Sequence, residues 1–229
     1  FHNSHTMPKE APARRQVRLG IRDITLDIKY PELNEFDLHN LERFNIHVNF
    51  MSLDKSSDNL PSFFAPCPKD SFPDPSEEAL GGSYNGIDDK TELSLTRSSS
   101  RAYILNNYLS NYIHNCDITM NGPEFPWTSK EDKEYPFPGL YKYTPPEFGC
   151  YSATYLEGPD HPHVKTIMYN NRIATDSTIL TSKLIPILRI MLVQLLKVRF
   201  IHHMVTPVRT KSPIAAGPIR EIFNNSLLT

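Results

Sequence analysis

Hydrophobic and polar residues alternate along two stretches near the N-terminus. In residues 17–30 the apolar positions are 17, 19 and 21 and then, after a change of phase near Asp23, 24, 26, 28 and 30. In residues 44–50 every second position is apolar, from Phe44 to Phe50. A period of two is typical of a strand with one buried face, and a change of phase indicates a bulge or break. We therefore predict that the two stretches form an antiparallel pair of strands.

The middle of the chain predicts one helix and several strands. Apolar positions 105, 109, 112 and 116, widened by 102, 108 and 113, have helical spacing, and serines at 98–100 offer N-caps. Three segments predict strands: "ELSLTR", "CYSATYLEG" and "HVKTIMYNN". The last two are joined by "EGPDHP", which indicates a hairpin connection.

Residues 180–208 are the most apolar stretch. Arg189 and Lys197 interrupt it, whereas a membrane-spanning helix needs about 20 mostly apolar residues. We therefore predict a buried core helix that lies across the sheet. Pro186 would break a helix interior, so we expect it in a first turn, giving a short helix and then a long one. Thr206-Pro207 would end the long helix, with His202 and His203 in its last turn.

These elements predict an α+β fold. Strand pairs without regular strand–helix alternation favour an antiparallel sheet covered on one face by a mid-chain helix and a long C-terminal helix. Twenty prolines against nine glycines indicate long extended connections, and residues 54–90 predict a long acidic loop. We expect a flexible basic N-terminal arm at 1–16, a single domain at 17–207 and a C-terminal tail at 208–229.

Composition narrows the class of protein. Of 229 residues, 39% are hydrophobic and 22% charged, which is typical of a folded soluble domain. A net charge of −2 argues against nucleic acid as the default partner, and we expect the acidic loop and the basic ends to neutralise each other. An odd number of cysteines, Cys67, Cys116 and Cys150, predicts no disulfide framework. The first residues have no apolar core, so we expect no signal peptide and an intracellular location, cytoplasmic or nuclear.

Candidate catalytic residues are few, because the phosphate-loop, dinucleotide, nucleophile-elbow and zinc-protease motifs are all absent. No motif requires a cofactor. Asp74, Asp88 and Lys90 are spaced as in one nuclease superfamily, where two carboxylates hold Mg²⁺ and a lysine lies near the phosphate. Cys150 is a candidate thiol that would pair with His161 or His163 across the hairpin.

The same hairpin carries the candidate metal ligands Asp160, His161 and His163. Two histidines two positions apart on a strand project to one face, as a divalent cation needs. A solvated hairpin turn is the alternative interpretation of this segment.

A second loop combines prolines and aromatic residues. Exposed tryptophan and tyrosine are common anchors of protein interfaces, so this loop is a candidate partner surface. The alternative is that these side chains fold back and extend the core. The partner-binding candidates are Trp127, Tyr135, Phe137, Tyr141 and Tyr143.

A small apolar ligand between the long helix and the sheet is a further possibility. The candidate wall residues are Met191, Leu195, Val198 and Phe200 from the helix and Ile46, Val48 and Phe50 from the sheet. The function expected from the sequence is a non-enzymatic protein-interaction module. The alternatives are a metal-dependent hydrolase or nuclease-like enzyme, and a binder of such an apolar ligand.

The run "TSKLIPILRIMLVQLLKVRFIHHMVTPV" resembles uncharacterised proteins of ascomycete fungi. The resemblance covers the second half of the chain and implies no activity. After "HMVTPV" the chain departs from that group, which suggests a truncated or altered C-terminus.

Overall fold

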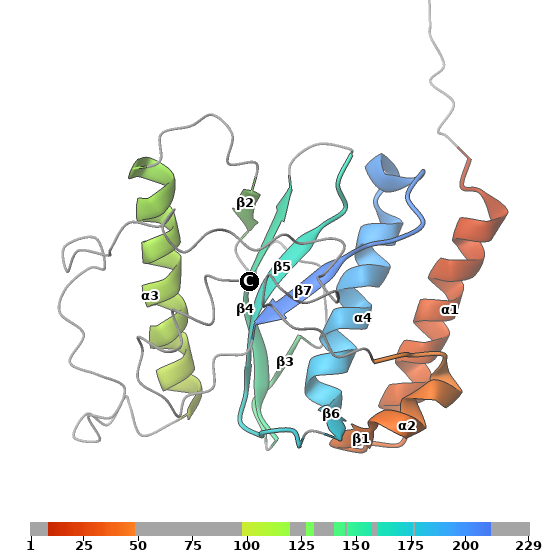
Figure 1. The fold of residues 1–229 in the computed structure, drawn as a ribbon, viewed down its shortest axis with the longest axis horizontal. Coiled ribbons are helices and arrows are strands. Elements are labelled where there is room, and N and C mark those ends of the chain that lie inside the picture. Colours follow the sequence, from red (N-terminus) through yellow and green to blue (C-terminus); the bar gives the residue numbers. More distant parts are fainter. Residues whose placement is uncertain are drawn as a thin grey trace, which may run out of the picture.

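The computed structural model describes residues 9–48, 98–119, 127–130, 140–144, 146–156, 160–175 and 177–211. Within these ranges it is an α+β fold, as predicted (Figure 1). A central sheet lies between helix α3 (Ser98–Thr119) on one face and helix α4 (Thr181–Leu196) on the other. Helix α1 (Pro12–Lys29) packs on the far side of α4 (Figure 1). The predicted long loop at 54–90 and the strand "ELSLTR" lie outside the described residues.

The central sheet is built around the predicted hairpin. Strand β4 (Phe148–Leu156) pairs antiparallel with β5 (Val164–Asn170), which confirms both strands and their antiparallel pairing. Strands β2 (Trp127–Lys130) and β3 (Tyr141–Lys142) both pair antiparallel with β4, on its other edge. Strand β7 (Val208–Lys211) runs parallel to β5, so the sheet is mixed rather than wholly antiparallel. The parallel pairing follows from topology, because the chain leaves β5 and returns through α4 as a helical crossover.

Side chains of β4 point to both helices, so the expectation that both helices cover one face is wrong. Ala153 and Tyr155 pack with Val164 and with Ile190 of α4. On the opposite face, the Tyr151 hydroxyl donates to the Ser99 carbonyl of α3 (2.9 Å). In α3 itself, Ala102 and Leu105 of the predicted apolar stripe are buried and Tyr108 is half-buried.

The first predicted strand, 17–30, is wrong, because these residues form α1. Ile21, Ile24 and Ile28 belong to the core between α1 and α4. Their spacing of three and then four residues is that of one face of a helix. The change of phase near Asp23, which predicted a bulge in a strand, is therefore the three-residue spacing of apolar positions on one face of a helix. Helix α1 begins at Pro12, inside the segment 1–16 that was expected to be a flexible arm. Strand β7 begins at Val208, the first residue of the expected tail. The division of the chain into arm, domain and tail stays a prediction.

The second predicted strand is also wrong over its described part. Residues 42–44 form the 3₁₀ helix η1 (Glu42–Phe44), and Asn45 ends it in a left-handed conformation (φ 58°). Helix α2 (Leu38–Leu41) precedes it, and strand β1 (Glu35–Asp37) pairs with β6 (Thr178–Leu180) in a separate two-stranded sheet. These elements close the end of the α1–α4 core, with Phe36 and Leu41 buried in it.

Helix α4 is one continuous helix, so the predicted break at Pro186 is wrong. Pro186 is its sixth residue and is fully buried, in the second turn. The missing N–H would have bonded the Ser182 carbonyl, a loss typically of about 3 kcal/mol or more, and the packing on both sides of α4 outweighs it. The helix ends at Leu196, and the short 3₁₀ helix η5 (Val198–Phe200) follows. His202 and His203 therefore lie after η5 rather than in the last turn of α4. Among the described residues, no helix is long and apolar enough to cross a membrane.

Candidate functional site

Tyr141 of β3 lies flat against the sheet because its partner in β4 is a glycine. The two strands place Tyr141 opposite Gly149. A Cβ atom at Gly149 would lie 2.8 Å from Cδ1 of the tyrosine ring and 3.0 Å from Cε1. The Tyr141 hydroxyl donates a hydrogen bond to the backbone carbonyl of Cys150. The ring is thus fixed at both ends by β4.

Tyr143 stacks on this fixed ring. The two ring centroids are 6.2 Å apart and the planes are inclined by 10°, an offset-stacked arrangement that aromatic pairs favour. The Tyr143 residue is 84% exposed, whereas Tyr141 is half-buried and packs against the cluster of Leu140, Cys150 and Met168. We call Tyr141 and Tyr143 the tyrosine pair. At this edge of the sheet the exposed ring of Tyr143 stacks on the ring of Tyr141, which β4 holds in place.

The other partner-binding candidates are placed in part. Trp127 begins β2, where its backbone pairs with Leu156 along the same edge of β4 that carries β3. Tyr135 and Phe137 lie outside the described residues. Tyr141 packs against the buried cluster and so extends the core, which was the alternative interpretation of this loop. Tyr143 is exposed and does not extend the core.

The structure does not bring Cys150 and the hairpin histidines together. Cys150 is buried opposite Met168, whereas His163 precedes Val164, which pairs with Tyr155. Along the regular partner strand β5, four steps separate Met168 from Val164, which is roughly 13 Å at about 3.3 Å per residue. The catalytic candidates Asp74, Asp88 and Lys90 lie outside the described residues.

His161 and His163 do lie close together, with ring centroids 5.8 Å apart and an edge-on contact. Asp160 is exposed beside them. Burial lowers the pKa of His163, and the nearby charges of His161, His203 and Lys165 lower that pKa further. Within the described ranges, no three His, Cys, Asp or Glu side chains are placed to hold a metal ion.

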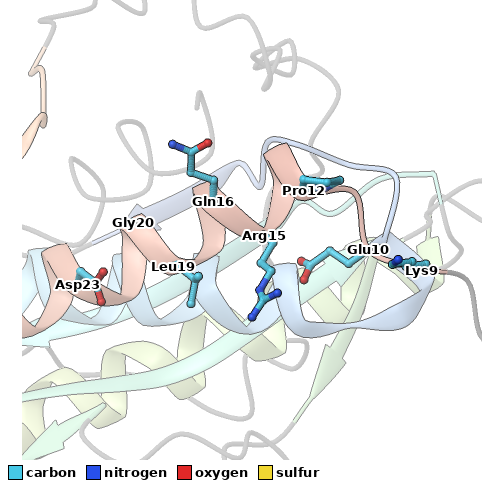
Figure 2. A pocket seen from close by; sticks show the side chains of 8 residues that line it. All are labelled: Lys9, Glu10, Pro12, Arg15, Gln16, Leu19, Gly20 and Asp23. Atoms are coloured by element: carbon cyan, nitrogen blue, oxygen red, sulfur yellow. The ribbon is translucent and has the colours of Figure 1, made fainter.

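The expected wall of an apolar ligand site is not assembled. Ile46 packs in the α1–α4 core, neither Ile46 nor Val48 lies in a strand of the central sheet, and Phe50 lies outside the described residues. Leu195 and Phe200 are each 1% exposed. A shallow hollow of about 500 Å³ instead runs along α1, lined by side chains from Lys9 to Asp23 (Figure 2).

A polar network at the start of α1 was not predicted from the sequence. Arg14 is 3% exposed; its Nε donates to the His203 carbonyl (3.0 Å) and its Nη2 to the Leu195 carbonyl (2.6 Å). Its Nη1 forms an ion pair with Glu10 (2.6 Å), which also binds Arg18 (2.9 Å). The hydrogen bond from Arg18 lowers the pKa of Glu10. The only local signal was Glu10 preceding Arg14 by four residues, a spacing that favours a helical ion pair.

Comparison with known protein families, curated proteins and solved structures found no match for this chain. The resemblance of residues 181–208 to ascomycete proteins therefore stays a prediction.

Proposed function

We propose that this chain is a protein-interaction module whose partner covers the tyrosine pair. The observation that carries this proposal is that Tyr143 is 84% exposed while its ring stacks on the ring of Tyr141, which β4 holds in place. Binding normally costs free energy because interface side chains lose rotamer freedom. Stacking on Tyr141 removes part of that cost before a partner arrives, since Tyr141 is fixed by Gly149 and by the Cys150 carbonyl.

The chemistry of the pair suits a protein partner. Each tyrosine combines a large apolar ring with one polar hydroxyl group, which is why tyrosine is enriched among residues that dominate binding energy. The backbone of Lys142 links the two tyrosines, and Lys142 is exposed, so the same edge offers one positive charge.

The test is the recovery of partners from a native extract by the immobilised chain, compared with the Tyr143→Ala variant. A residue that dominates an interface contributes at least about 2 kcal/mol, so we expect roughly 30-fold weaker retention of the partner. Tyr143 is exposed, so the variant keeps the fold, and a thermal unfolding curve verifies this.

Tyr30→Ala is the matched control, because Tyr30 is 85% exposed at the end of α1, on a different element. It removes the same side chain at the same exposure and should retain the partner fully. If both variants recover the same proteins as the unmodified chain, the tyrosine pair is not the partner surface.

A further inference from the structure

The chain beyond the end of α4 folds into a short series of tight turns. We call residues 196–205 the tip; they include the last residue of α4, η5 and the turn after it (Figure 1). Backbone hydrogen bonds close each turn: Lys197 N to Gln194 O (3.2 Å), Phe200 N to Lys197 O (3.0 Å) and His203 N to Phe200 O (2.9 Å). The tip is therefore an ordered, compact structure.

The tip is held to the body of the protein from two sides. Phe200 is 1% exposed and anchors the tip from within. Arg14 of α1 binds the carbonyls of both Leu195 and His203. Because one guanidinium reaches both carbonyls, the backbone at the beginning of the tip lies near the backbone at its end.

Apolar side chains are unusually exposed on this structure. Four of them point to solvent: Leu196 (55%), Val198 (54%), Met204 (43%) and Val205 (53%). Single exposed apolar residues are common, but a group of them on one ordered surface marks an interaction site. These residues are not on the hollow along α1, whose lining extends only from Lys9 to Asp23.

Two cations, Lys197 and Arg199, lie among the exposed apolar residues of the tip, and this part of the chain contains no carboxylate. Residues 177–211 contain six lysines and arginines and no aspartate or glutamate. Lys197 and Arg199 belong to the tip itself and lie over the ring of Tyr155, at 5.3 and 5.5 Å from its centroid. The surface therefore combines positive charge with projecting apolar side chains, and its electrostatic complement is an anionic partner.

We infer that the tip docks on the surface of an anionic lipid bilayer. In this arrangement Leu196, Val198, Met204 and Val205 enter the boundary between head groups and acyl chains, and Lys197 and Arg199 remain at the level of the phosphates. Peripheral proteins bind membranes through this combination of buried apolar area and attraction to anionic lipids. An amphipathic helix of a protein partner would need an apolar groove. The tip instead exposes its apolar side chains on a segment of tight turns, which favours insertion into a bilayer.

The test is co-sedimentation of the full chain with vesicles of phosphatidylcholine mixed with phosphatidylserine, and with vesicles of phosphatidylcholine alone. We expect sedimentation with the mixed vesicles only, decreasing as salt is raised. Each basic side chain near an anionic surface contributes about fivefold to partitioning. The double variant Lys197→Gln and Arg199→Gln should therefore bind about 25-fold more weakly.

The charge control removes two positive charges from a different part of the protein, helix α1. Arg22 and Lys29 are exposed on α1, so the double variant Arg22→Gln and Lys29→Gln has the same net charge as the tip variant. It should bind like the unmodified chain. Equal loss in both double variants, or no sedimentation of the unmodified chain with mixed vesicles, would overturn the proposal.

A third variant, Val198→Ser with Val205→Ser, tests insertion of the apolar side chains separately from charge. Removing half-exposed valines that would enter the bilayer should weaken vesicle binding roughly tenfold. Unmodified vesicle binding by this variant would contradict apolar insertion. A short DNA duplex is the last comparison: if the tip cations are needed for DNA binding while vesicles do not bind, the tip is a polyanion site and the lipid assignment is wrong.

Discussion

Replacing Arg14 with methionine removes a guanidinium that joins three parts of the structure. Its Nη2 bonds the carbonyl of Leu195, in the last turn of α4, and its Nε bonds the carbonyl of His203. The last four carbonyls of a helix have no partner within the helix, and a cation there also interacts favourably with the helix dipole. Arg14→Met leaves both carbonyls without this donor and leaves Glu10 paired with Arg18 alone.

The expected loss can be estimated from these contacts. A hydrogen bond to a charged group contributes about 1.5–3 kcal/mol, and Arg14 donates two such bonds, to the carbonyls of Leu195 and His203. Methionine recovers part of this by filling the space with apolar atoms. We therefore expect a decrease of about 3–5 kcal/mol in the free energy of unfolding, which corresponds to a Tm lower by about 6–20 °C for a chain of this size.

Urea unfolding followed by circular dichroism measures this change, with Arg15→Met as the control. Arg15 is the next residue of α1 and is exposed, so its replacement should change the free energy of unfolding by less than about 0.5 kcal/mol. Arg14→Lys should give an intermediate loss, because lysine keeps the charge but not the planar fork of donors. A loss below about 1 kcal/mol for Arg14→Met, or one equal to that of Arg15→Met, would refute the role assigned to Arg14.

Four further predictions concern stability. Gln194 is 1% exposed and neither polar atom of its side chain has a hydrogen-bond partner among the described residues, so Gln194→Leu should raise the free energy of unfolding by about 1–3 kcal/mol; a lower midpoint in urea would contradict this. Gly20 lies inside α1 with open space where a Cβ would be, so Gly20→Ala should stabilise the protein by about 0.5–1 kcal/mol in the same assay. Gly149→Ala should destabilise it and increase the mobility of the Tyr141 ring in NMR spectra, because the new Cβ overlaps that ring. The lowered pKa of His163 means that the unfolded chain binds this proton first as pH falls below about 6.5. The contribution of neutral His163 to the free energy of unfolding is therefore complete above pH 6.5 and is lost as pH falls through the lower pKa of the folded state. His163→Gln should flatten the dependence of Tm on pH in this range.

The sequence selected the residues of the candidate surface but not their geometry. Proline and aromatic residues predicted an interaction surface, which stays a prediction, and Tyr143 is exposed. The position of Tyr141 against Gly149 depends on the register between β3 and β4, which no local pattern specifies. The tip was missed for a related reason. Its apolar residues continue the composition of α4, so they were expected in a buried helix, whereas the helix ends at Leu196.

Local spacing by itself determined the elements whose period is unambiguous. The hairpin of β4 and β5 alternates over several residues on both sides of a proline-marked connection, and α3 has a long helical stripe. Helix α1 was misassigned because a spacing of four residues, such as Ile24 to Ile28, is even and fits both a strand and a helix. Only the spacing of three residues from Ile21 to Ile24 distinguishes a helix from a strand here. In the structure, the packing of these residues against α4 shows that the segment is a helix.

The tertiary structure alone decided which polar groups are buried. Arg14 belongs to a segment with the composition of a flexible basic arm, yet it is 3% exposed because carbonyls of residues 195 and 203 surround it. Arg14 and His203 are 189 positions apart in sequence. Pro186 is likewise buried inside a helix, and α4 is held there by packing against α1 and against the central sheet. Burial depends on contacts between segments far apart along the chain, and such contacts leave no periodic signal in either segment.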